Sequence, residues 1–64
     1  MKKTTLKQKL LMYLSKQKQT PEVRRMMMAI SLARNLRSQK SIRQIMLFSS
    51  KNNIDLIGYY NKIR

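Results

Sequence analysis

The sequence predicts an all-α fold in which three to four short amphipathic helices form one small domain over residues 1–64. Apolar residues recur at helical spacing along most of the chain. A single Gly and a single Pro leave few places for a long break, and recognisable capping residues precede several apolar stretches. A chain of this length buries only about 60% of the surface that its unfolded form exposes. We therefore expect a small core that binding partners complete.

The first helix is expected at about residues 5–18. Its apolar positions follow one another at i, i+4, i+7 and i+8, which places them on one helical face. They are Leu6, Leu10, Tyr13 and Leu14. Lysines cover much of the remaining surface, so this helix is predicted to pack along a single stripe.

The second helix is expected at about residues 21–39, and its start is well marked. Thr20 suits the N-cap, Pro21 suits the first turn, and Glu22 lies at the positive end of the helix dipole. Apolar residues then cover an arc of roughly 200°. They are Met26, Met28, Ala29, Ile30, Leu32, Ala33 and Leu36. An arc this wide predicts a central helix, or one that also docks on another protein.

The opposite arc of this second helix is polar. It contains Arg24, Ser31, Arg34, Asn35 and Ser38, together with Met27. At 100° per residue Arg24 and Arg34 lie near each other on this arc, so both guanidinium groups are expected to face one ligand surface. Arg25 and Arg37 are expected within or beside the apolar arc.

A third, short helix is expected at about residues 42–50. Ser41 and Gln44 have the spacing of a capping box, in which the Gln side chain reaches back to the N-cap amide. The residues expected to point inward are Ile42, Ile45, Met46 and either Phe48 or Ser49.

The last helix is expected at about residues 54–63, with Asn53 as its cap and Asp55 at its favourable end. Leu56, Tyr60 and Ile63 then share one face. Gly58 weakens this helix by about 1 kcal/mol relative to Ala. A strand from Ile54 to Tyr60 is the alternative.

The composition argues against catalysis and metal binding. The sequence contains no Cys and no His, and its only carboxylate side chains are those of Glu22 and Asp55. A zinc, calcium or paired-carboxylate site needs more ligands than these. We expect no enzymatic activity, catalytic residue, metal, cofactor or small-molecule substrate. No apolar run reaches 18 residues, so we expect no membrane partner.

The net charge of +13, with fifteen Lys and Arg residues, is the dominant functional signal. A solvated surface is the alternative explanation, but solubility needs a net charge of only about 2–8 in a small domain. Phosphate binding explains the excess, because each neutralised phosphate releases condensed counterions. The residues expected to bind RNA are Lys2, Lys3, Lys7, Lys9, Lys16, Lys18, Arg24, Arg25, Arg34, Arg37, Lys40, Arg43, Lys51, Tyr59, Lys62 and Arg64.

Residues 24–36 read R-R-M-M-M-A-I-S-L-A-R-N-L. This segment resembles the RNA-binding helix of the eighteenth protein of the bacterial-type small ribosomal subunit, whose pattern is R-x-L-x-x-A-I-x-x-A-R-x-L. The matching residues are Arg24, Ala29, Ile30, Ala33, Arg34 and Leu36, and Met26 stands where that family prefers Leu. The resemblance implies contact with small-subunit RNA and docking on a neighbouring ribosomal protein.

Residues 41–63 are similar to helix-turn-helix segments of the resolvase and small-repressor type. Ser49 or Ser50 stands at the turn position usually given to Gly, and Met46 stands where a small residue is usual. This resemblance implies a DNA-binding regulator whose recognition helix would cover residues 53–60.

The favoured interpretation is a structural constituent of a ribosome that binds ribosomal RNA. Neighbouring ribosomal proteins would dock on the apolar arc of residues 21–39. The many Lys, Asn, Ile and Met residues suit an AT-rich genome, which favours a mitochondrial, organelle-encoded ribosome over a cytoplasmic location. The alternatives are the helix-turn-helix regulator and a cationic membrane-binding peptide. The membrane peptide fits less well, because it needs one clean apolar face.

Overall fold

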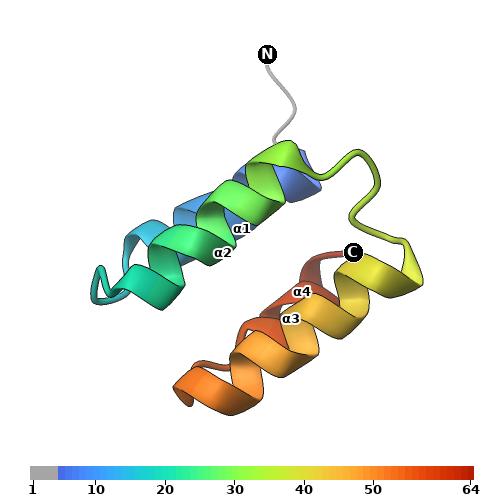
Figure 1. Cartoon of the computed structure of the whole chain (residues 1–64). Helices are drawn as coiled ribbons and strands as arrows, with labels where there is room; N and C mark the ends of the chain where they lie inside the picture. The colour runs from blue at the N-terminus through green and yellow to red at the C-terminus, as the bar shows by residue number, and fades with distance from the viewer. Residues whose placement is uncertain (1–4) are drawn as a thin grey trace.

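The computed structural model describes residues 5–64. Within this range the chain forms α1 (Leu6–Ser15), α2 (Pro21–Leu32), α3 (Gln39–Asn52) and α4 (Leu56–Ile63). Helices α1 and α2 form one antiparallel pair, α3 and α4 form a second, and the two pairs pack face to face (Figure 1). The all-α prediction is confirmed. The alternative of a strand over residues 54–60 is wrong, because this segment lies largely in α4.

The first two helices begin where side chains satisfy the free backbone N–H groups of the first turn. Thr20 caps α2 as predicted, and its hydroxyl accepts a hydrogen bond from the Val23 amide at 3.2 Å. Thr5 and Gln8 form a capping box at the start of α1. Helix α1 ends at Ser15, earlier than the predicted boundary at residue 18.

Helix α2 is shorter than predicted, because it ends at Leu32 and not near residue 39. Residues 33–38 form a loop instead. Neither Gly nor Pro marks this break. Asn35 and Ser38 offer the backbone side-chain hydrogen bonds that compete with helix continuation.

The third helix starts earlier than predicted, at Gln39, and extends to Asn52. Its N-cap is Ser38, whose hydroxyl accepts from the Ser41 amide at 3.3 Å. The predicted capping box at Ser41 and Gln44 is therefore wrong. Ser41 is buried, and its hydroxyl donates to the Asn35 carbonyl at 3.0 Å.

The cap of α4 is Asp55 and not Asn53. Asn53 instead ends α3 in the left-handed conformation, with φ of 53°, which Asn tolerates well. The Asp55 carboxylate accepts a hydrogen bond from the Gly58 amide at 3.1 Å. A Cβ atom on Gly58 would overlap this carboxylate, which explains a glycine inside a helix that it otherwise weakens.

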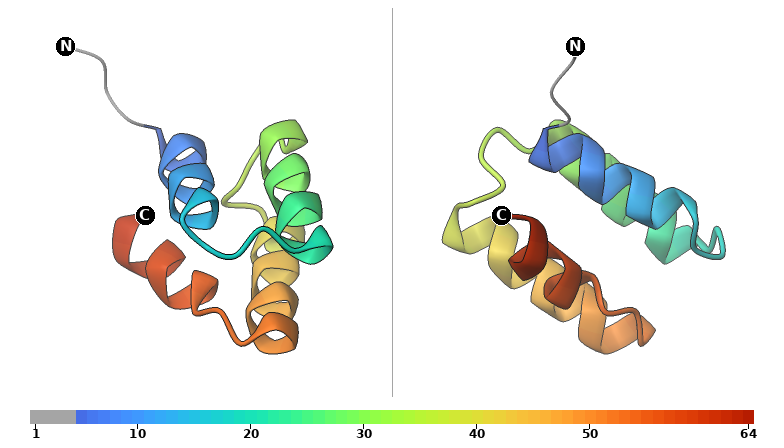
Figure 2. Two further views of the ribbon diagram at one scale, coloured as in Figure 1. Left: turned by 90° about the vertical axis from the view of Figure 1, so that its left-hand side faces the viewer. Right: turned by 180° about the vertical axis from the view of Figure 1, so that it is seen from behind.

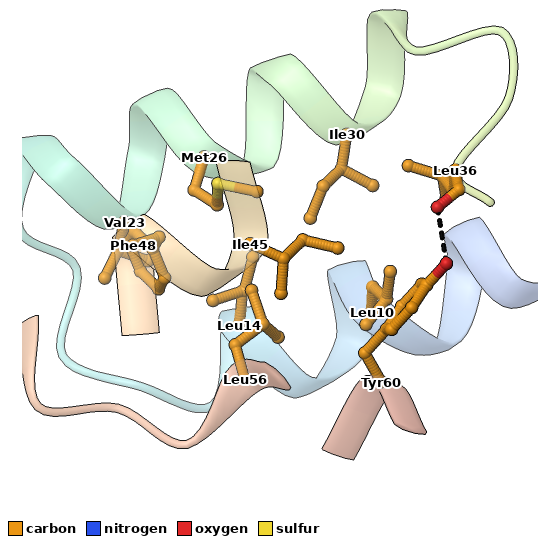
Figure 3. Close-up of a cluster of buried hydrophobic side chains, with 10 residues drawn as sticks. All are labelled: Leu10, Leu14, Val23, Met26, Ile30, Leu36, Ile45, Phe48, Leu56 and Tyr60. Atoms are coloured by element: carbon orange, nitrogen blue, oxygen red, sulfur yellow. Dashed lines mark hydrogen bonds between the residues drawn. The ribbon is translucent and has the colours of Figure 1, made fainter. Parts of the chain in front are cut away.

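The core lies between the two helix pairs (Figure 3). It takes side chains from all four helices and from the 33–38 loop. They are Leu10, Leu14, Val23, Met26, Ile30, Leu36, Ile45, Phe48, Leu56 and Tyr60. The predicted inward faces of the first and last helices are confirmed, since Leu10, Leu14, Leu56 and Tyr60 are fully buried.

The predicted apolar arc of the second helix is too wide. Met28 and Leu32 are 65% and 76% exposed, and only the side that carries Val23, Met26 and Ile30 is buried. A helix in a two-layer fold covers its partner with one face, so the far half of a 200° arc stays in solvent. Met46 was also expected inward, and it is 53% exposed. No helix in residues 5–64 has the length and apolarity needed to cross a lipid bilayer.

Candidate nucleic-acid interface

The charges of the chain are divided unequally between the two ends of the bundle. One end is formed by the start of α1, the 33–38 loop, the start of α3 and the end of α4 (Figures 1 and 2). We call it the basic end. Within the described residues it carries no Asp or Glu side chain. Its Lys and Arg residues are Lys7, Arg34, Arg37, Lys40, Arg43, Lys62 and Arg64.

Both carboxylate side chains of the chain lie at the opposite end. Glu22 is in the first turn of α2 and Asp55 caps α4. Five of the predicted RNA-binding residues share that end with them. They are Lys16, Lys18, Arg24, Arg25 and Lys51, all of them exposed. Among the described residues, the basic end therefore carries the larger excess of positive side chains, because no acidic side chain offsets its cations.

The loop at the basic end is held by hydrogen bonds on both sides. The Asn35 carboxamide oxygen accepts from the Arg37 amide at 3.0 Å, and the Asn35 carbonyl accepts from the Ser38 amide at 3.3 Å. The Leu36 side chain is buried in the core. The Tyr60 hydroxyl donates to the Leu36 carbonyl at 2.6 Å, which connects the loop to α4 (Figure 3).

This bracing fixes the backbone that carries the two loop arginines. Arg34 and Arg37 are exposed on either side of the buried Leu36. Their guanidinium groups are exposed, while hydrogen bonds hold the backbone that carries them. A pre-organised donor loses less conformational entropy when it binds a phosphate, and the guanidinium fork can hold that phosphate bidentately.

Two further elements bring cations to the same end. The Arg64 guanidinium lies 5.5 Å from the centre of the Tyr60 ring, the ring whose hydroxyl contacts the loop. The Lys7 ammonium donates to the Ser31 carbonyl at 2.9 Å and so ties the start of α1 to the last turn of α2. That bond places a positive charge at the negative end of the α2 dipole, so part of the role of Lys7 is structural.

A groove of about 430 Å³ lies between the end of α2, the loop and the start of α3. Arg34 and Lys40 both line it, together with polar side chains such as Asn35 and Gln44 and the small side chains of Ala29 and Ala33. Arg43 lies one turn along α3 from Lys40 and is also exposed. The 33–38 loop and the start of α3 thus both contribute exposed cations to the basic end.

The prediction that Arg24 and Arg34 lie on one helical face is wrong. Arg24 is in the first turns of α2, whereas Arg34 follows the end of this helix. Arg25 and Arg37 were expected within or beside an apolar arc, and both are exposed. Lys9 is half-buried on α1, between the two ends. Lys2 and Lys3 lie outside the described residues.

Tyr59 is half-buried and stacks on Tyr13, with ring centres 4.4 Å apart and an angle of 12° between the planes. Tyr60, its neighbour, is fully buried. Tyr59 therefore lies at the surface between α1 and α4, whereas Tyr60 belongs to the core.

A second, apolar groove of about 260 Å³ lies between α2 and α3 and shares Ala29 and Gln44 with the first. It lies beside Ala29, Leu47 and Phe48, with Arg25 and Glu22 on α2 and Lys51 on α3 at its edges. Leu47 is 62% exposed. Apolar and charged side chains from α2 and α3 thus line the same groove.

Three residues that hold the 33–38 loop were not predicted to do so from the sequence. Asn35, Ser38 and Ser41 position the loop, yet they were assigned to a helical face or to another cap. The signal was present, because N-x-x-S-x-x-S contains an Asx-turn residue followed by a residue suited to an N-cap. The helical periodicity of residues 26–36 obscures this local pattern.

No protein family, curated protein or solved structure matches the chain. Function is therefore inferred from the charge and geometry of the chain itself.

Proposed function

We propose that the chain binds the phosphate backbone of ribosomal RNA through its basic end, as a structural component of a ribosome. The observation that carries this proposal is the braced 33–38 loop, which presents Arg34 and Arg37 on a surface free of Asp and Glu side chains within the described residues. Charges that only keep a protein soluble do not require a loop held in this way. Phosphates of a folded RNA are the ligand that matches many separated cations on one end of a small domain.

The mechanism is electrostatic and positional. Arg34, Arg37 and Lys40 would each neutralise a phosphate, and counterion release would drive association. Because these side chains come from a loop and a helix start, they are suited to a curved or junction-like backbone where two RNA strands approach each other. The protein would stabilise this approach by screening the phosphates from one another.

Placement in a ribosome, and in its small subunit, rests on the resemblance of residues 24–36 to a ribosomal RNA-binding helix. In the structure this segment covers α2 from Arg24 and continues into the loop, so Arg34 and Leu36 lie beyond the helix. A mitochondrial, organelle-encoded ribosome remains the favoured setting, on composition.

A protein neighbour would dock on the exposed side of α2 and on the α2–α3 groove. Met28 and Leu32 project into solvent from α2, and Leu47 does so from α3. Covering these side chains would contribute about 25 cal/mol for each Å² of apolar surface removed from water. This supports a neighbouring ribosomal protein as the second partner.

Binding of a structured RNA over a range of salt concentrations tests the mechanism. We expect the logarithm of the association constant to fall linearly with the logarithm of the salt concentration, with a slope that corresponds to several phosphate contacts. A slope near zero would contradict electrostatic binding. A strong preference for one duplex DNA sequence would instead favour the helix-turn-helix alternative.

Sucrose-gradient fractionation of the native source tests the ribosomal assignment. We expect the chain to sediment with the small ribosomal subunit and to leave it at high salt. Sedimentation only at the top of the gradient, under low-salt conditions that preserve ribosomes, would exclude the assignment.

A further inference from the structure

The surface between α1 and α4 contains a groove of about 500 Å³, away from the loop of the basic end. Its lining comes from both helices: Lys9, Met12 and Tyr13 from α1, Lys16 from the C-cap of α1, and Tyr59 and Ile63 from α4. Its volume lies within the range of about 300–1,000 Å³ that is typical of small-molecule sites. No Asp or Glu side chain is among the residues that line it.

The stacked pair of Tyr13 and Tyr59 forms the aromatic part of this groove. Unlike Tyr60, which is buried and bonded through its hydroxyl, both rings remain half-buried. Within residues 5–64 neither of their hydroxyl groups makes a side-chain hydrogen bond to a neighbouring element. A tyrosine side chain combines an apolar ring with a polar hydroxyl, so this half-buried pair suits a flat, partly polar ligand.

Lysines lie on both sides of this aromatic pair. Lys9 precedes Tyr13 by one turn of α1 and Lys16 follows it by about one turn, so the three side chains occupy one strip of the helix. Met12, at the rim, is 57% exposed and offers an adaptable apolar contact. A ring surface between two ammonium groups matches one nucleotide, whose base lies between two phosphates.

We propose that this groove binds an unpaired nucleobase of single-stranded RNA, which stacks on the Tyr13–Tyr59 pair while Lys9 and Lys16 contact the flanking phosphates. The proposal rests on the proposed function, because it assumes an RNA partner. It adds a distinct site and a distinct specificity. The basic end recognises phosphates of any RNA, whereas the tyrosine groove selects RNA with an unstacked base.

Tyrosine fluorescence of the full chain provides a direct measurement. The sequence contains three Tyr and no Trp, so two of the three emitting side chains belong to the groove. Three probes are compared: a short oligoadenylate, an oligomer of the same length with abasic riboses, and an RNA duplex. We expect the oligoadenylate to quench the emission and the abasic oligomer and the duplex to leave it nearly unchanged.

Replacement of Tyr59 separates stacking from charge. Tyr59→Leu keeps apolar bulk at the edge of the core, and it should lower the affinity for oligoadenylate about tenfold without changing the affinity for the duplex. Tyr59→Phe keeps the ring and should restore binding. An equal loss for oligoadenylate and the abasic oligomer, or no loss for oligoadenylate, would overturn the proposal.

A second variant covers the case in which Tyr59→Leu fails to fold. Lys9→Gln with Lys16→Gln leaves the aromatic pair intact. Each single-strand phosphate contact contributes about 0.7 to the slope, so the variant should reduce the salt slope for oligoadenylate by about 1.4 while the slope for the duplex stays constant. Equal slopes for wild type and variant would contradict the site. If none of the three probes binds in a salt-dependent manner, the proposed RNA-binding function itself fails, which is a different outcome from duplex binding without base stacking.

Discussion

The hydrogen bond from Tyr60 to Leu36 gives a sharp prediction about how the basic end is held. The Tyr60 side chain is fully buried, and its hydroxyl lies 2.6 Å from the Leu36 carbonyl oxygen. Tyr60→Phe removes the donor and leaves a buried carbonyl without its partner, which costs about 1–3 kcal/mol. For a domain of this size each 1 kcal/mol lowers the Tm by about 4–8 °C.

Thermal unfolding followed by circular dichroism measures this loss. Concentrated sodium sulfate in the buffer screens the net charge and strengthens apolar burial, so that the isolated chain remains folded. Tyr59→Phe is the matched control, because it removes a hydroxyl from the adjacent, half-buried tyrosine. A Tm for Tyr60→Phe equal to that of Tyr59→Phe would refute the argument that this bond pins the 33–38 loop.

Hydrogen exchange adds a local readout. The Arg37 amide donates to the Asn35 side chain inside the loop. If the Tyr60 hydroxyl holds the loop in place, the Arg37 amide should exchange faster in Tyr60→Phe than in Tyr59→Phe. Unchanged exchange at Arg37 would show that the loop is held by its own hydrogen bonds.

Two further predictions concern the second helix and the start of the third. Ile30→Ala should destabilise the fold by about 2–5 kcal/mol, because Ile30 is 1% exposed, whereas Leu32→Ala at a 76% exposed position should change the stability by about 0.5 kcal/mol or less in denaturant unfolding. Equal losses would mean that the buried face of α2 is assigned incorrectly. Ser38→Ala should cost about 1 kcal/mol through loss of the α3 N-cap, while Ser50→Ala on the exposed side of the same helix should cost almost nothing. A smaller effect at Ser38 than at Ser50 would contradict the assigned cap.

The helix starts show where sequence reasoning is effective. Thr20, Pro21 and Glu22 act locally, so their pattern predicts the start of α2 without knowledge of the rest of the fold. The stripe that contains Leu10 and Leu14 was equally readable, because α1 buries a single narrow face. Both features depend on residues close together in the sequence.

The end of α2 depends on residues far apart in the sequence. Leu36 continues the helical periodicity of the second helix, yet it enters the core from a loop whose carbonyl is bonded by Tyr60, 24 residues later. Periodicity cannot distinguish a helical apolar residue from a loop residue that is buried by tertiary contact. The same limit hides the basic end, because its cations come from four separate segments that only the fold brings together.

The most direct test of the central claim compares two double variants that each remove two positive charges. Arg34→Gln with Arg37→Gln alters the basic end, and Lys18→Gln with Lys51→Gln alters the end that carries both carboxylates; all four residues are exposed. Binding to one RNA duplex is measured over a range of salt concentrations. Each phosphate contact contributes about 0.9 to the slope, so the first variant should lose about two units of slope while the second keeps the wild-type slope. Equal losses in the two variants would show that net charge alone drives binding, and that the basic end is not the interface.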